Sequence, residues 1–230
     1  MSHNIKEIIK NLSVDCVIFG FERGCMEVLL IRRAINPQKG MWALPGGFIK
    51  KEEQVHDAAQ RVLKVTTGVD DRYLEEVGVF DRIDRYPLWR VFTIAHFALI
   101  SPKHYALVPG IDTSEVRWFK LSDLPELVFD HQEIIDRALV RLRSRIRTRP
   151  IGFELLSKKF TLPQLQRLYE EILGHEIDKR NFRKKVLKLN LLKKLKEVHK
   201  TKKGRSAALF MFDTVNYNKL KEDGFIFELS

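Results

Sequence analysis

The sequence predicts two consecutive domains of different class. The first, over residues 1–148, is a mixed α/β sheet sandwiched by helices; the second, over 149–230, is a small basic domain of helices and a β-hairpin. Strand-like and helical segments alternate in the first part. The chain then reaches Pro150, which blocks helix continuation. Charge changes at the same point, because 149–230 contains 19 Lys and Arg against 10 Asp and Glu, whereas 1–148 contains 22 against 20.

The first domain is expected to begin with a short amphipathic helix, from the spacing of Ile5, Ile8, Ile9 and Leu12. Two strands follow around a Glu22-Arg23-Gly24 turn and form a hairpin. After a loop rich in glycine and proline, a helix runs to about Thr67 and ends at Gly68. The hairpin strands are expected at 15–21 and 26–32, and the remaining elements are strands at 74–80, 90–100 and 115–119 and a last helix at 130–147.

Composition limits the classes of protein that this chain can belong to. Apolar residues make up 44% of the chain, enough for packed cores, but no run approaches the roughly 18 apolar residues of a membrane span. We therefore expect a cytoplasmic protein. Cys16 and Cys25 both lie in strand-like segments and are assigned no function, because buried free thiols are common there.

The segment from Gly47 to Val69 resembles the Nudix box, a motif that holds magnesium against a diphosphate. Its frame is Gly47-x5-Glu53-x7-Arg61, followed by Gly68-Val69. The Trp42-Ala-Leu-Pro-Gly-Gly-Phe48 segment before it and Trp118-Phe119 after it are similar to the same superfamily. The resemblance implies a Nudix-type fold over about residues 12–130.

Three glutamates of the Nudix box are replaced in this chain, by Val62, Val65 and Thr66. Magnesium needs oxygen ligands, and neither Val nor Thr supplies an anionic one. Glu53 and Asp57 share a helix face, so a displaced metal site is one alternative, and pairing of Asp57 with Arg61 is the simpler one. We expect no catalytic residue, no metal site and no cofactor, and therefore a domain that binds a ligand instead of cleaving it.

The pocket of such a sensing domain should lie in the cleft of the Nudix fold. A sugar would need planar polar groups for its hydroxyls and an aromatic face. The expected effector-binding residues, for which core packing or a solvated turn is the competing interpretation, are Trp42, Phe48, Phe80, Asp81, Arg82 and Arg90.

The second domain contains the order of a helix-turn-helix. Thr161 and Pro163 begin an amphipathic helix that ends at Gly174, and a second helix starts at Asp178. On the second helix an apolar stripe lies opposite a cationic face that carries an amide, as a helix that enters a major groove requires. Arg180 and Asn181 are expected at base edges and the lysines at phosphates.

Two strand-like runs, 195–198 and 207–212, bracket a cationic hairpin tip that predicts a wing. A solvated basic face is the competing interpretation of the helix alone, but it does not explain the paired strands. The expected DNA-binding residues of helix and wing are Arg180, Asn181, Arg183, Lys184, Lys188, Lys200, Lys202, Lys203 and Arg205.

A degenerate Nudix domain followed by a winged helix-turn-helix resembles the Nudix-related transcriptional regulators. The segments Phe129-Asp-His131, Arg149 to Leu156 and Phe160 to Leu165 carry the match in the second half. The resemblance implies a homodimeric repressor that binds double-stranded operator DNA and releases it when a small effector binds. Because the metal ligands are replaced, L-arabinose, the effector of a branch found in gut bacteria, is the expected effector. The alternative is ADP-ribose, either sensed by a regulator of NAD metabolism or weakly hydrolysed.

Overall fold

The computed structural model describes residues 7–70, 73–200 and 206–222. It divides into two compact units. The first comprises Met1–Gly20 and Glu27–Arg141, and the second comprises Phe21–Met26 and Leu142–Ser230. Each unit is described by itself, and the domain boundary expected between residues 148 and 149 stays a prediction.

A mixed seven-stranded sheet forms the first unit, in the order β3-β2-β1-β6-β5, with β4 paired to β1 and β7 to β2. β1 and β6 run parallel and place Leu12 beside Phe92, whereas β1 and β4 run antiparallel. The strands are β1 (Ile8–Glu22), β2 (Cys25–Arg33), β3 (Trp42–Ala43), β4 (Gly46–Lys50), β5 (Glu75–Phe80), β6 (Phe92–Leu99) and β7 (Thr113–Lys120).

The prediction of a short helix at the N-terminus is wrong over the described residues, because strand β1 already begins at Ile8. Ile8 pairs with Lys50 of β4, and Leu12 with Phe92 of β6. Apolar residues spaced three and four apart can also occur in a long strand whose pairing register shifts. The pairing of β1 with β4 has a register shift between Ile8 and Ser13. Backbone pairing on both sides therefore overrides the helical pattern.

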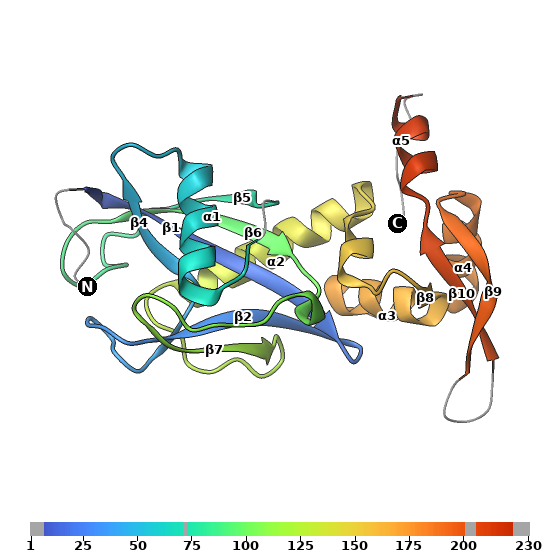
Figure 1. The fold of residues 1–230 in the computed structure, drawn as a ribbon, viewed down its shortest axis with the longest axis horizontal. Coiled ribbons are helices and arrows are strands. Elements are labelled where there is room, and N and C mark those ends of the chain that lie inside the picture. Colours follow the sequence, from blue (N-terminus) through green and yellow to red (C-terminus); the bar gives the residue numbers. More distant parts are fainter. Residues whose placement is uncertain (1–6, 71–72, 201–205, 223–230) are drawn as a thin grey trace. The chain divides into compact units, whose positions relative to one another are not determined.

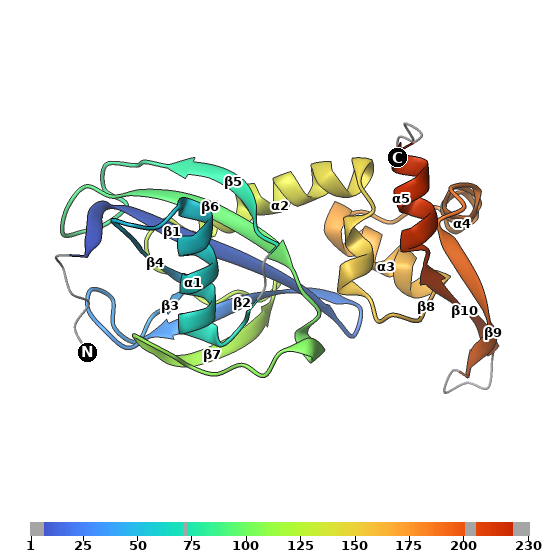
Figure 2. The same ribbon diagram turned by 45° about the horizontal axis from the view of Figure 1, so that its top comes forward.

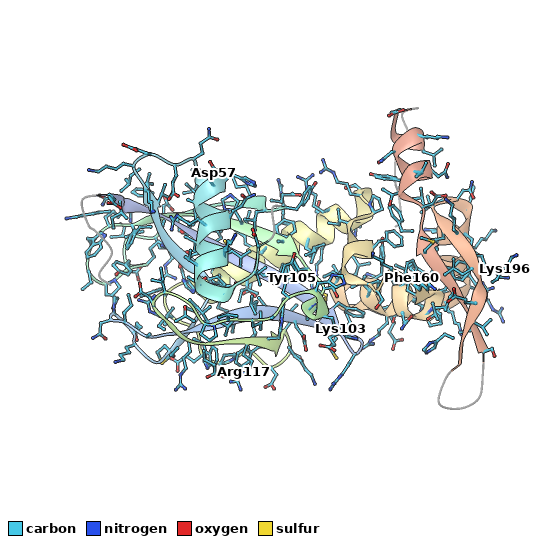
Figure 3. All side chains as sticks on the ribbon, viewed as in Figure 1. Asp57, Lys103, Tyr105, Arg117, Phe160 and Lys196 are labelled. Carbon is cyan, nitrogen blue, oxygen red and sulfur yellow. The ribbon has the colours of Figure 1, made fainter. Side chains whose placement is uncertain are left out.

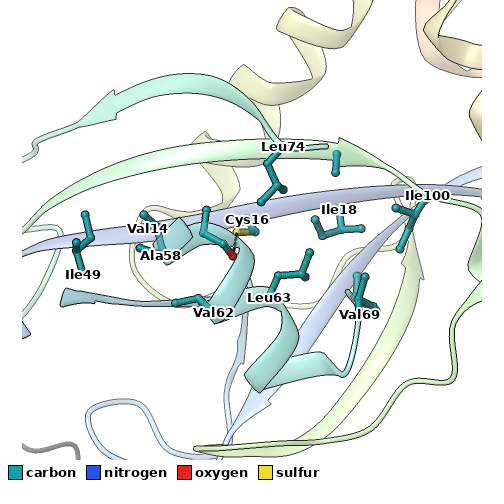
Figure 4. Packing of buried hydrophobic residues seen from close by; sticks show 13 residues of the cluster. Val14, Cys16, Ile18, Ile49, Ala58, Val62, Leu63, Val69, Leu74 and Ile100 are labelled. Atoms are coloured by element: carbon teal, nitrogen blue, oxygen red, sulfur yellow. Dashed lines mark hydrogen bonds between the residues drawn. The ribbon is translucent and has the colours of Figure 1, made fainter. Parts of the chain in front are cut away.

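Two helices cover opposite faces of this sheet (Figures 1 and 2). α1 (Val55–Thr67) packs its apolar side on the face of β1 that carries Val14, Cys16 and Ile18. Val62 and Leu63 of α1 belong to the buried apolar core between this helix and the sheet (Figure 4). α2 (His131–Thr148) begins on the other face, where it meets Asp15. A short 3-10 turn, η1 (Pro102–His104), follows β6.

The described part of the second unit contains the end of α2, helices α3, α4 and α5, and a three-stranded sheet of order β8-β10-β9. Thr161 caps α3 through a reciprocal capping box with Gln164, and Asp178 caps α4. Both caps confirm the sequence-based expectation. The elements are η2 (Ile151–Leu155), β8 (Phe160–Thr161), α3 (Leu162–Leu173), α4 (Lys179–Lys188), β9 (Leu192–Lys200), β10 (Ser206–Phe212) and α5 (Thr214–Glu222).

The winged arrangement is confirmed, since β9 and β10 pair antiparallel and Ser206 lies opposite Lys200. Both strands are longer than expected, and α5 was not expected at all. Across the described ranges, no helix has the length and apolar character of a membrane span.

Candidate effector site and nucleic-acid interface

Glu53, the glutamate retained from the Nudix box, is committed to a clamp with Arg61. Its carboxylate accepts hydrogen bonds from Arg61 Nε at 2.8 Å and from the Lys50 backbone N–H at 2.6 Å. Arg61 also donates from Nη2 to the Phe48 carbonyl oxygen at 3.0 Å. Burial alone would raise the pKa of Glu53, but the bonds from Arg61 and Lys50 lower it overall. The clamp therefore ties the middle of α1 and the turn before it to β4.

Apolar packing occupies the other box positions. Val62 is 2% exposed, and a Cβ placed on Gly47 would lie 3.1 Å from its Cγ2. Thr66 is buried and its hydroxyl donates to the Val62 carbonyl oxygen at 2.8 Å. Among the described residues, no group of three or more His, Cys, Asp and Glu side chains is arranged to hold a metal ion. The residues present at the box do not fit magnesium.

Asp57 takes no part in the Glu53 clamp. It lies on the exposed side of α1 (Figure 3), and Arg61 turns to Glu53 instead. The pairing of Asp57 with Arg61 expected from their spacing is therefore wrong, because the loop before α1 brings Glu53 closer.

A buried polar network lies on the opposite face of β1. Arg85 donates to both carboxylate oxygens of Asp130 at 2.9 Å and to Asp15 Oδ2 at 3.2 Å. Thr93 also donates to Asp15 Oδ2, at 2.8 Å. Burial lowers the pKa of His131, whose Nδ1 accepts from the Leu44 backbone N–H at 2.9 Å. The proton of its neutral ring therefore sits on Nε2, 3.7 Å from Asp15 Oδ1.

Beside this network lies a group of four side chains, here called the ring cluster: Phe48, Tyr86, Trp89 and Phe129. Phe48 and Trp89 are close to parallel, with centroids 6.1 Å apart and an interplanar angle of 26°. Tyr86 contacts Phe48, Trp89 and Phe129 at an angle. The guanidinium of Arg33 lies 5.5 Å from the Phe129 ring centroid. The cluster is partly exposed and is the strongest candidate for an effector site in this unit.

Of the residues expected to bind an effector, Phe48 belongs to the ring cluster. Trp42 instead packs edge-on against Phe119, with ring centroids 4.7 Å apart, and the guanidinium of Arg117 lies 4.9 Å from the Trp42 ring centroid. Figure 3 shows Arg117 on β7. Phe80 is 4% exposed and covered by Arg137.

The other three polar candidates lie outside the cluster. Asp81 is exposed, and Arg82 pairs with the exposed Asp84 at 3.0 Å. Arg90 lies over Phe92. Their exposure favours a solvated turn over an effector pocket for Asp81 and Arg82.

Sequence reasoning missed Tyr86, Trp89, Phe129 and Arg33 as site residues. The signal for the first two was present, because two aromatic side chains fall within four residues of a loop that carries a charged residue at position 85. No local signal connects this loop with Phe129 or Arg33, since their proximity arises only when the sheet forms.

The candidate nucleic-acid interface lies on α4. Phe182 and Val186 are 3% and 2% exposed and pack inward, where Phe182 meets Tyr169 of α3 at 5.5 Å. The opposite side of the helix is exposed and carries Arg180, Asn181, Lys184 and Lys188, with the exposed Arg183 at its edge. The helix thus presents the polar row that the sequence predicted.

The wing adds further cationic groups. Exposed lysines 193, 194 and 196 follow the edge strand β9, and Figure 3 shows Lys196 pointing outward from it. Of Lys200 only the backbone is described, and Lys202, Lys203 and Arg205 lie outside the described residues. The role predicted for these four residues stays a prediction.

Comparison with known proteins agrees with this two-part construction. Residues 10–138 match the NUDIX domain family, and residues 152–212 match the family described as NrtR DNA-binding winged helix domain. The "ADPR responsive transcriptional repressor NtrR" of Acinetobacter baylyi is 34% identical over 212 residues, 90% of this chain and 84% of the relative. The chain belongs to the NrtR family.

Solved structures of the NrtR family match most of this chain. Shewanella oneidensis NrtR complexed with a 27mer DNA is 32% identical, with a TM-score of 0.74, over 87% of this chain and 93% of that one. The NUDIX domain of the same protein, complexed with ADP ribose, is 32% identical with a TM-score of 0.54, over 61% of this chain and 94% of that one. The NrtR-type fold and its two domain types are thereby established for this chain.

An enzyme is also among the relatives. The "ADP-ribose pyrophosphatase" of Methanocaldococcus jannaschii is 38% identical over 109 residues, which is 47% of this chain and 63% of the relative. The match covers less than half of this chain.

Proposed function

We propose that the protein is a transcriptional repressor that binds operator DNA through α4 and the wing and is controlled by ADP-ribose in its Nudix domain. One observation carries the proposal: an exposed row of Arg180, Asn181, Lys184 and Lys188 on α4, in the same chain as a Nudix domain whose metal ligands are replaced. Guanidinium and amide groups suit base edges, and ammonium groups suit phosphates. The names of the Acinetobacter and Shewanella relatives support both the DNA and the ADP-ribose.

ADP-ribose is a better supported effector than L-arabinose, which the sequence favoured. No relative reported above is named for a pentose. The polar side chains that could serve sugar hydroxyls near the ring cluster, Asp15, Arg85 and Asp130, are bonded to one another. A pentose stays an untested prediction and serves as the comparison ligand.

Hydrolysis of ADP-ribose is the second candidate, favoured by the pyrophosphatase relative. Val62, Val65 and Thr66 supply no carboxylate for magnesium, and Glu53 is engaged by Arg61. We therefore expect binding of ADP-ribose without release of AMP or ribose 5-phosphate, with or without magnesium.

The repressor is further proposed to act as a homodimer on a palindromic operator, since two copies related by a two-fold axis present two recognition helices to two half-sites. The effector must bind better to the arrangement that does not bind DNA, because only differential affinity shifts such an equilibrium.

The test begins with selection of binding sequences from a random double-stranded DNA pool by the purified chain. Affinity for the selected fragment is then measured by fluorescence anisotropy without effector, with ADP-ribose, and with L-arabinose. We expect ADP-ribose to weaken binding and L-arabinose to leave it unchanged. Selection of no sequence would refute DNA binding, and unchanged affinity in saturating ADP-ribose would refute the switch alone.

A further inference from the structure

The turn between α3 and α4 is held by two side chains of α3. Gln166 Nε2 donates to the Ile177 carbonyl oxygen at 3.0 Å, and Glu170 Oε1 accepts from the Ile177 N–H at 3.1 Å. Gln166 Nε2 also donates to Glu170 Oε1, at 2.9 Å. The two side chains and the Ile177 backbone thus form a closed hydrogen-bonded group, here called the turn latch.

The turn latch lies directly before the part of α4 that is expected to read bases. Ile177 precedes the N-cap residue Asp178, whose side chain accepts from the Asn181 N–H at 2.8 Å. Arg180 and Asn181, the residues expected at base edges, follow Ile177 within about one helical turn. Where their side chains point therefore depends on where the turn places the first residues of α4.

Side-chain packing holds the middle of α4 more firmly than its start. Phe182 and Val186 are the buried residues of the helix. From 174 to 181, Ile177 is half-buried and every other residue is exposed. Two apolar contacts let a short helix tilt about them, so the turn latch supplies a separate constraint at the end of α4 that carries Arg180.

The end of α3 gives the turn latch a fixed base. The N–H of Gly174, which ends the helix with φ 78°, donates to the Glu170 carbonyl oxygen at 2.8 Å. Arg143 Nε donates to the Ile172 carbonyl oxygen at 2.7 Å. Both bonds satisfy acceptors that a helix end leaves open. Glu170 is therefore held through its backbone as well as its side chain.

We propose that Gln166 and Glu170 are positioning residues for sequence recognition by α4. Acting through the Ile177 backbone, they set where Arg180 and Asn181 meet base edges, so the proposal rests on the proposed function of α4. Base contacts need side chains held within about 0.5 Å of their productive place. Lysines reach phosphates on flexible stems, and such contacts carry no sequence information. Loss of the latch should therefore reduce the preference for one sequence and spare sequence-independent binding.

The test compares the selected operator fragment with a scrambled fragment of the same length and composition. Fluorescence anisotropy gives the affinity of the full-length chain for each. Gln166→Ala and Glu170→Ala should reduce the ratio of the two affinities about 5- to 150-fold, the discrimination that one bidentate base contact supplies. The salt dependence of binding to the scrambled fragment should stay unchanged, because the lysine contacts to phosphates remain.

Glu176→Ala is the matched control. It removes the same charge as Glu170→Ala from an exposed position of the same turn and leaves the latch intact, so it should keep the wild-type ratio. Glu170→Gln should also keep most of that ratio, since both side-chain bonds to Glu170 end on Oε1 and glutamine retains this oxygen. Melting temperatures check that every variant is folded.

The outcomes separate the latch from DNA binding itself. A Glu170→Ala protein with the same ratio as Glu176→Ala would overturn the positioning role and leave the repressor proposal standing. Equal weakening on both fragments, together with a lower melting temperature, would overturn it as well, because the two residues would then only stabilise the domain. A wild-type chain that prefers neither fragment would overturn recognition by α4 and the latch with it.

Discussion

At the scale of single residues, Arg85 holds two carboxylates in a place where water hardly reaches. The side chains of Arg85, Asp15 and Asp130 are 5%, 8% and 1% exposed. Burial alone would lower the pKa of Arg85, but Asp15 and Asp130 raise it. The guanidinium therefore stays charged and serves both acids.

Replacing Arg85 by Met should destabilise the fold strongly, because two buried carboxylates would lose their cation. Breaking a buried pair costs about 3–5 kcal/mol. Chemical denaturation followed by circular dichroism measures the loss. Arg82→Met is the control, since the Arg82–Asp84 pair is exposed and should contribute nothing measurable. Equal stability of the two variants would contradict the role of the network.

The Glu53–Arg61 clamp should make stability depend on acid. The folded pKa of Glu53 is lowered, so the clamp stabilises the fold above the unfolded value of about 4.3 and is lost as the pH falls through the folded value. We expect the unfolding free energy of wild type to fall more steeply than that of Arg61→Ala between about pH 5 and 3. Parallel curves for the two proteins would show that the clamp contributes no pH dependence.

At the scale of elements, the C-terminal end of α1 is closed by backbone groups from the segment before β7. Val108 and Ile111 N–H groups donate to the Thr67 and Val65 carbonyl oxygens at 2.9 and 3.0 Å. These bonds satisfy acceptors that a helix end leaves open. Gly110 fits because a Cβ there would lie 1.9 Å from the Val65 carbonyl oxygen.

Gly110→Ala should therefore separate this segment from α1. We expect a loss of about 1–3 kcal/mol, the usual range for forced overpacking, measured as a lower denaturation midpoint. Ile111→Ala is the control, because its side chain is 53% exposed and its backbone bond remains. A Gly110→Ala protein as stable as this control would refute the close contact.

Elements with local signals could be predicted from the sequence, and elements without them could not. Thr161, Asp178, Gly68 and Gly174 mark helix ends by their own chemistry, and all four do so in the structure. α5 escaped prediction because its apolar residues are sparse, although Asp213 caps it through the Asn216 N–H.

The same distinction separates the two sites. The cationic row on α4 was predictable because one helix supplies both its buried and its exposed faces. The ring cluster was not, since Phe48, Tyr86 and Phe129 meet at 6.3 and 5.4 Å only through tertiary folding. For Phe80 the sequence suggested a pocket residue because the side chain stands at a strand end. In the structure its ring is buried under Arg137.

At the scale of the whole molecule, positive charge is concentrated where DNA binding is proposed. Residues 149–230 carry a balance of +9, and residues 1–148 a balance of +2. Each cation placed on a phosphate releases counterions, so affinity falls with salt in proportion to the number of such contacts.

Replacing both Lys184 and Lys188 by Ala should weaken binding to every DNA sequence similarly and reduce the slope of log affinity against log salt by about two. Anisotropy titrations at several salt concentrations provide the slope. Lys120→Ala, an exposed lysine at the end of β7, should leave it unchanged. A double variant with the wild-type slope would exclude these lysines from phosphate contact.

The packing of Val62 also limits which substitutions the Nudix-box positions can accept. Val62 is 2% exposed against Gly47, so a glutamate introduced there alone would bury an unpaired carboxylate. Carboxylates at positions 65 and 66 would bring no metal while Glu53 remains bound to Arg61. A glutamate at position 62 therefore lowers stability before any ligand set is complete. Restoring carboxylates to the box would therefore require several substitutions together with repacking around Gly47.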